Sequence, residues 1–199
     1  MGVLSEIYNT VVTYKGRQYK TNPAYDIVLA IQNLMGEEDV SDTDKLDCAL
    51  SMLCKSGTSS LSLKDKAGLL REIYKSQINL PKKMNVGKQV KLVDFELDGE
   101  YIYASFYKDY GIDLLEQQGK LHWKKFIWLF QGLSKDTKIK EIMRIREMDI
   151  PEPNNYNQKE RQSIMELKAY YQLPVSTNSG KSGIEGLFHT LESVAKHGK

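Results

Sequence analysis

Gly180, Lys181 and Ser182 look like the end of a phosphate-binding loop, in which backbone N–H groups and a lysine hold the phosphates of a nucleotide. The complete motif has a glycine five positions before its second glycine, and Val175 stands there. The motif also needs a strand before it and a firm helix after it, whereas the residues here are small and polar. We therefore expect no nucleotide site and no cofactor.

Histidine and cysteine are the next candidates for chemistry. A general base needs a nucleophile or a metal ligand within reach, and nothing near His122 supplies one. We predict instead a structural histidine, hydrogen-bonded to the end of a neighbouring helix. Cys48 and Cys54 would lie about 120° apart around a helix, which does not suit a metal pair. We expect reduced thiols, a reducing cytoplasm and no metal site.

Acidic side chains gather where helices are predicted to begin and end. Asp94 and Asp98 are four residues apart at a predicted helix start, where the helix dipole favours negative charge. Asp109 and Asp113 flank Gly111, in positions typical of turns and caps. Capping explains the positions of these carboxylates without catalysis. We therefore expect no catalytic residue, and we predict that the protein is not an enzyme.

The segment KLHWKKFIWLFQG, residues 120–132, is the most informative part of the sequence. At 100° per residue, one broad apolar face results, made of Trp123, Phe126, Ile127, Leu129 and Phe130. Trp128 projects instead between Lys124 and Lys125. Two interpretations stay open: a helix enclosed on nearly all sides, or a tryptophan offered to a partner. On the second, we predict a partner-binding surface that includes Leu121, Lys124, Lys125 and Trp128.

The elements that position these residues are mainly helical. Residues 11–21 read VVTYKGRQYKT and predict a short β-hairpin around Lys15 and Gly16, lying against a helix. Helical periodicity then predicts about seven helices. The expected spans are Pro23 to Gly36, Ser41 to Gly57, Ser62 to before Pro81, Asp94 to Gly111, residues 120–132, Ser134 to before Pro151, and a last helix ending at Leu173.

The predicted organisation has two helical halves. We expect a hairpin with three helices over residues 1–80 and an aromatic-rich four-helix region over residues 94–173. Between them, residues 81–93 carry Lys82, Lys83, Lys88 and Lys91. We interpret them as a basic linker, since nucleic-acid contacts usually interleave aromatic residues.

Residues 174–199 form a predicted flexible tail. A polar stretch precedes a short amphipathic pattern of Ile184, Leu187, Phe188 and Leu191. The pattern indicates either a docking helix or a segment that folds only on a partner. We count these four residues among the partner-binding candidates.

Composition, charge and hydropathy further restrict the class of protein. The chain has 199 residues, 41% of them hydrophobic, and a formal net charge of +2, which gives no argument for a nucleic-acid partner. No run of about 18 apolar residues exists, so we expect no membrane span. The first residues lack a basic stretch followed by an apolar block, so we expect no secretory signal.

Several segments together resemble a family of siphophage proteins, common in phages and prophages of Gram-positive bacteria. The resemblance rests on YIYASFYKDYGIDL, LHWKKFIWLFQGLSKDTKIKEIM, RIREMDI and KERQSIMELKAYYQL, all between residues 101 and 173. The earlier half is similar too, with its strand pair, acidic loop and the helix DVSDTDKLDCALSML. In all, the resemblance covers roughly residues 11–173.

The resemblance implies a tail assembly chaperone, encoded between the major tail protein and the tape measure protein. Such a protein would bind the tape measure protein and recruit tail-tube subunits in the host cytoplasm, then leave before the virion is complete. A homo-oligomer is possible, and the resemblance brings no catalytic residue with it. Two alternatives stay open: a structural tail or connector component that is retained in the virion, and a nucleic-acid-binding regulator using residues 81–91.

Overall fold

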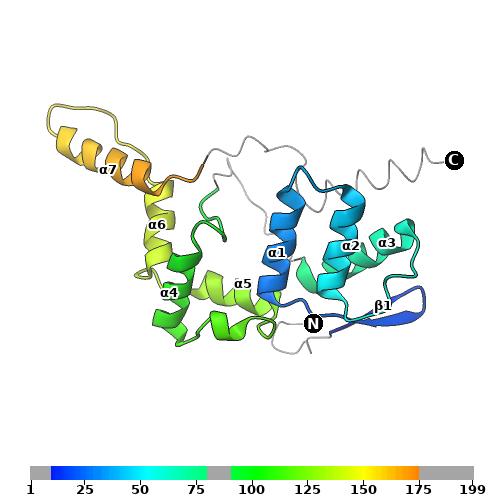
Figure 1. Ribbon diagram of the computed structural model, residues 1–199. Helices are drawn as coiled ribbons and strands as arrows, with labels where there is room; N and C mark the ends of the chain where they lie inside the picture. The colour runs from blue at the N-terminus through cyan, green and yellow to red at the C-terminus, as the bar shows by residue number, and fades with distance from the viewer. Residues whose placement is uncertain (1–9, 80–90, 175–199) are drawn as a thin grey trace. The chain divides into compact units, whose positions relative to one another are not determined.

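The computed structural model describes residues 10–79 and 91–174. Over these residues the chain is mainly helical, with seven α-helices and one two-stranded antiparallel hairpin, as predicted (Figure 1). The elements are β1 (Val11–Tyr14), β2 (Arg17–Lys20), α1 (Tyr25–Gly36), α2 (Asp42–Leu53), α3 (Leu63–Ile73), the π-helical turn η1 (Tyr74–Ile78), α4 (Gly99–Tyr110), the 3-10 turn η2 (Leu115–Gln117), α5 (Trp123–Gly132), α6 (Lys138–Glu147) and α7 (Gln158–Tyr171).

The described chain forms two compact units that are not continuous in sequence. The first unit holds residues 10–79 and 118–126, and the second holds residues 91–117 and 127–174. The division therefore falls inside α5. Most of the predicted basic linker, and nearly all of the predicted tail, lie outside the described residues.

The hairpin forms because its turn residues accept positive φ angles. Lys15 has a φ of 49° and Gly16 a φ of 77°, the pair of values that a two-residue turn between twisted strands needs. Val12 pairs with Tyr19, and both side chains are buried. The hairpin lies against α3, where Tyr14 packs directly over Gly68. The predicted packing against a helix is confirmed.

Serine caps begin two helices of the first unit as predicted. The Ser41 hydroxyl accepts the Asp44 N–H at 3.2 Å, and the Ser62 hydroxyl accepts the Asp65 N–H at 3.2 Å. However, α2 ends at Leu53 rather than at Gly57. The reason is tertiary: the Asn22 N–H donates to the Leu53 carbonyl, and Cys54 forms a β-bridge with Thr21.

The second unit begins with a different cap from the one expected. Asp94 does not cap α4; its carboxylate accepts the Glu96 and Leu97 N–H groups, each at 3.0 Å, in a preceding turn. The helix itself starts at Gly99, after Asp98. Gly111 ends it with a φ of 61°, as predicted.

The core of the second unit is built from one stripe each of α4, α5 and α6. Its buried apolar residues on these helices and their connections are Ile102, Phe106, Leu114, Ile127, Phe130, Leu133, Ile139, Ile142 and Ile145. The helical spacing of Ile102, Tyr103, Phe106, Tyr107 and Tyr110 predicts one apolar face for α4. The prediction is wrong at Tyr107, which is 59% exposed. Within this unit, α7 extends from the end of α6 and away from α4 (Figure 1).

Candidate interaction surfaces

The N-terminal turn of α5 contributes to the core of the first unit. Trp123 and Phe126 are buried, with ring centroids 5.8 Å apart, and Phe126 also stacks on Tyr25 at 4.8 Å. The helix begins at Trp123 rather than at Lys120 because the preceding residues pair with another segment. The Leu121 carbonyl accepts the Tyr25 N–H at 2.9 Å, and the Trp123 N–H donates to the Pro23 carbonyl at 2.8 Å.

His122 has a structural role, but it caps its own helix, α5, rather than the end of a neighbouring helix as predicted. Its Nδ1 accepts the Lys124 N–H at 3.1 Å, and its carbonyl accepts the Phe126 N–H at 3.0 Å. Burial, reinforced by the charges of Lys124 and Lys125, lowers the pKa of His122 to about 4. The imidazole is therefore neutral near pH 7, as an acceptor at a helix N-terminus must be.

The predicted partner-binding residues divide between the two units. Leu121 and Lys124 are half-buried in the first unit, and Lys125 there is exposed. The Lys124 ammonium group donates to the Ser76 carbonyl at 2.9 Å, so it already has a structural contact. Trp128 belongs to the second unit and is half-buried. Its burial is intermediate between that of a residue enclosed by its neighbours and that of a tryptophan offered to a partner.

The candidates in the tail, Ile184, Leu187, Phe188 and Leu191, lie outside the described residues. The partner-binding role of the whole set therefore stays a prediction.

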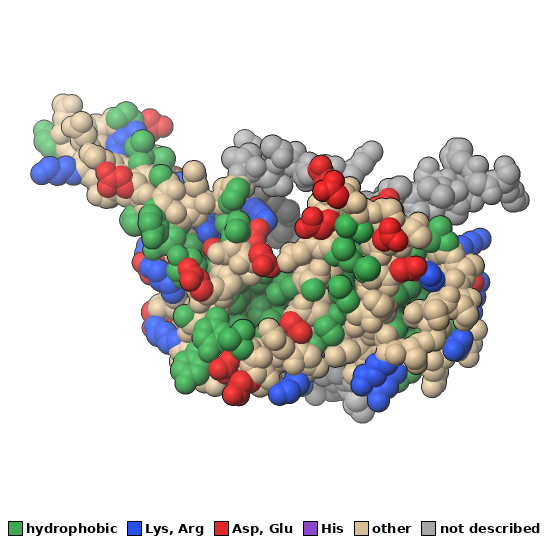
Figure 2. All heavy atoms as spheres, viewed as in Figure 1, with side chains coloured by type: hydrophobic (Ala, Val, Ile, Leu, Met, Phe, Trp, Pro, Cys, Tyr) green, Lys and Arg blue, Asp and Glu red, His purple; other side chains and the backbone are tan. Residues whose placement is uncertain are grey.

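Sequence reasoning missed a surface of the second unit at the junction of α4 and η2. Tyr107 is 59% exposed and Leu115 is 65% exposed, whereas helical periodicity placed Tyr107 on the buried face. Figure 2 shows hydrophobic side chains gathered on the surface over the lower end of α4, with acidic side chains beside them. The sequence carries a signal for this surface, because the apolar and aromatic residues of α4 are spread over more than one face of the helix.

Helix α7 carries a second exposed apolar group. None of its residues is buried, although the helical spacing of Ile164, Leu167 and Tyr171 predicts one apolar stripe. Tyr170 is 76% exposed, and Met165 and Leu167 are also exposed. The helix is attached mainly near its C-terminus, where the Tyr171 ring meets Tyr101 edge-on at 6.3 Å and Lys138 lies over it at 5.2 Å.

A buried ion pair connects the elements of the second unit. Two nitrogen atoms of Arg146 donate to the two Asp98 carboxylate oxygens at 2.6 and 2.8 Å. The guanidinium group also donates to the Leu92 carbonyl at 2.9 Å. The pair therefore joins α6 to the start of α4 and to the chain that leads into it.

Residues 10–79 and 91–174 contain no group of three or more His, Cys, Asp or Glu side chains placed to hold a metal ion. Cys48 is exposed and Cys54 is buried, and both are free thiols. Burial raises the pKa of Cys54 to about 11, which keeps it protonated. No helix in the same ranges is both long and apolar enough to cross a bilayer.

Comparison with known protein families identifies the family of the chain. Residues 5–173 match the family described as "Bacteriophage Gp15 protein". The chain belongs to this family of bacteriophage proteins. Neither the curated proteins nor the solved structures contain a match.

Proposed function

We propose that the protein is a non-catalytic tail assembly chaperone that binds the tape measure protein and recruits tail-tube subunits of the major tail protein. It would act in the host cytoplasm and leave before the virion is complete. Membership of a bacteriophage family supports a role in the phage cycle. The observation that carries the proposal further is the exposed apolar and aromatic surface of the second unit, on α4, η2 and α7.

The physical case rests on the nature of the client. A tape measure protein is a long helical protein that exposes apolar surface before the tube forms around it, and such surface aggregates unless it is covered. An amphipathic helix laid on an apolar surface is a recurrent mode of recognition. Many copies on one client would hold it through avidity, so each contact can be weak enough to release.

Co-expression tests the proposal directly. The tape measure protein of the same phage is produced alone and with the full chain, and its soluble fraction is compared. We expect the chain to raise that fraction and to co-purify with the client. No increase in solubility and no co-purification would contradict the proposal.

Mass spectrometry of purified virions separates the proposal from a retained structural component. A chaperone should be absent from mature particles, while the major tail protein and tape measure protein are present. Detection of the chain in stoichiometric amounts would favour the structural alternative.

A further inference from the structure

The exposed surface at the end of α4 is built from Tyr103, Tyr107 and Leu115, which we call the tyrosine–leucine patch. Tyr103 and Tyr107 are one helical turn apart, and their rings stack with centroids 6.4 Å apart and an angle of 15° between planes. Tyr103 is half-buried, whereas Tyr107 and Leu115 are mostly exposed. The patch therefore presents two aromatic rings and one aliphatic side chain to solvent.

A single carboxylate fixes the parts of this patch. The Tyr103 hydroxyl donates to Asp113 Oδ2 at 3.2 Å. The other oxygen of Asp113 accepts the Leu115 N–H at 2.9 Å and the Glu116 N–H at 3.3 Å. Because the two elements are tied together before any partner arrives, less conformational entropy is lost on binding.

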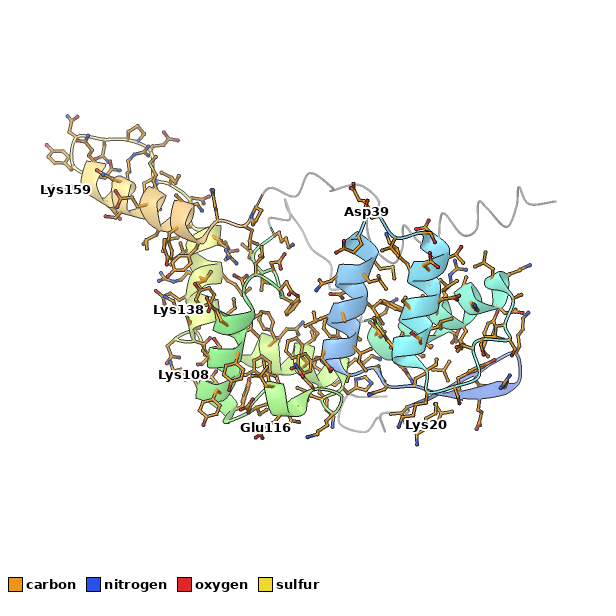
Figure 3. All side chains as sticks on the ribbon, in the orientation of Figure 1. Lys20, Asp39, Lys108, Glu116, Lys138 and Lys159 are labelled. Carbon is orange, nitrogen blue, oxygen red and sulfur yellow. The ribbon has the colours of Figure 1, made fainter. Side chains whose placement is uncertain are left out.

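The charges beside the patch are negative. Desolvation raises the pKa of Tyr103, and the hydrogen bond from its hydroxyl to Asp113 and the charges of Asp113 and Glu116 raise it further. Lys108, the lysine of α4, is engaged with Asp136, donating to its carbonyl at 2.8 Å and its carboxylate at 3.0 Å. Figure 3 shows Glu116 at the lower edge of this unit, below α4.

We propose that the tyrosine–leucine patch binds an amphipathic helix of a partner protein whose apolar residues are flanked by lysine or arginine. Leu115 and the tyrosine rings would cover the apolar residues, and an aromatic face also attracts a cation. The carboxylates of Asp113 and Glu116 complement the flanking positive charges and disfavour an acidic helix. The identification of this helix with the tape measure client rests on the proposed function.

Two model peptides of about 18 residues test the partner chemistry, since that length gives five helical turns. One contains leucine and lysine at amphipathic spacing, and the other has glutamate in place of every lysine. Binding to the full chain is followed by fluorescence anisotropy, and the site by amide chemical shifts. We expect the leucine–lysine peptide to bind about tenfold tighter than its acidic counterpart and to shift the amides of Tyr107 and Leu115.

Substitutions then test the surface. Tyr107→Ala combined with Leu115→Ser should weaken binding of the leucine–lysine peptide about tenfold, because these side chains supply the exposed apolar area. Glu116→Lys should weaken binding of the basic peptide and strengthen binding of the acidic peptide. Tyr156→Ala is the matched control, since Tyr156 is 98% exposed and lies outside the patch; it should change nothing. Circular dichroism confirms that each variant is folded.

Three results would overturn the inference: equal affinity for the two peptides, unchanged binding by the folded double variant, or shifts confined to α7. The co-expression assay separates this failure from that of the proposed function. If the double variant solubilises the tape measure protein as well as the wild type does, the chaperone role stands and the patch is wrong. If the wild type does not solubilise the tape measure protein, whereas the preference for the basic peptide holds, the patch stands and the chaperone role fails.

Discussion

Lys168 and Arg146 each cap the helix that carries the other. The Lys168 ammonium group, on α7, donates to the Arg146 carbonyl at 2.7 Å, near the end of α6. Arg146 Nε in turn donates to the carbonyl of Tyr171 at 2.6 Å, at the end of α7. Lys168 also reaches the Met148 carbonyl at 2.5 Å. Carbonyls at a helix end need such donors, so this exchange holds α7 in place although α7 itself has no buried residue.

Lys168→Met should therefore loosen α7 and leave the rest of the second unit folded. Methionine keeps an apolar stem but removes the charge that satisfies the carbonyls at the end of α6. We expect faster hydrogen exchange along α7, while the amides of Ile102 and Ile142 keep their protection. Lys159→Met is the control, because Lys159 lies at the start of α7, away from this contact (Figure 3). Equal effects of the two variants would contradict the capping role.

Asp98→Ala should destabilise the second unit far more than the removal of an exposed partner. The change leaves the Arg146 guanidinium buried without its carboxylate, which typically costs about 3–5 kcal/mol. Asp136→Ala removes an exposed ion pair with Lys108 and should cost far less, because water screens exposed ion pairs. Denaturant unfolding followed through the Ile142 amide compares the two. Similar losses would mean that the buried pair contributes no more than the exposed one.

Local signals in the sequence predicted most elements, whereas contacts between distant residues were beyond reach. The hairpin turn at Lys15 and Gly16 and the cap at Ser41 depend on residues a few positions apart. The end of α2 and the start of α5 depend on pairing with residues 21–25, which no local pattern encodes.

The candidate surface shows the same limit. Helical periodicity orders side chains around one helix but does not say how much of its circumference neighbours cover. Tyr107 was assigned to the core for that reason, and it is exposed. The reciprocal caps of Lys168 and Arg146 were not predicted, because 22 residues separate the two.

Gly68→Ala should destabilise the first unit even though alanine favours helices. A Cβ at position 68 would lie 2.7 Å from Cζ of Tyr14, so the Tyr14 ring would have to shift from its place over α3. We expect a loss of about 1–3 kcal/mol, typical of overpacking. With Tyr14→Ala in the background the clash is gone, and Gly68→Ala should stabilise the unit by up to about 1 kcal/mol. A double-mutant cycle from urea unfolding measures this change of sign.

Acidification from pH 7 to 4.5 should destabilise the first unit through His122. Its folded pKa of about 4 lies below the value of about 6.5 in an unfolded chain. The unfolded chain therefore takes up the proton first. The stability contributed by the neutral imidazole is complete above about pH 6.5 and is lost as the pH falls toward 4. The slope is at most about 1.4 kcal/mol per pH unit, and less because the side chain is half-exposed.

His122→Asn is the matched control for this pH dependence. The asparagine oxygen can accept the Lys124 N–H but does not titrate, so the stability of the variant should change less over the same range. Hydrogen bonds from lysines lower the pKa values of Asp65 and Asp136 below 3.8. The titration of these carboxylates therefore affects stability at a lower pH than that of His122. Urea unfolding of both proteins at pH 7, 6, 5 and 4.5 supplies the comparison. Parallel curves would assign the effect to other groups.

Trp128→Ala tests whether α5 contributes to client binding beyond the core. The side chain is half-buried, so its loss should lower the melting temperature less than Phe130→Ala does, since Phe130 is buried and packs edge-on against Phe95 at 5.3 Å. Truncation of a buried phenylalanine typically costs about 3–5 kcal/mol. If Trp128 belongs to the partner surface, Trp128→Ala should reduce solubilisation of the tape measure protein at a temperature where the variant is fully folded. If it unfolds the protein as Phe130→Ala does, Trp128 is a core residue and the client binds elsewhere.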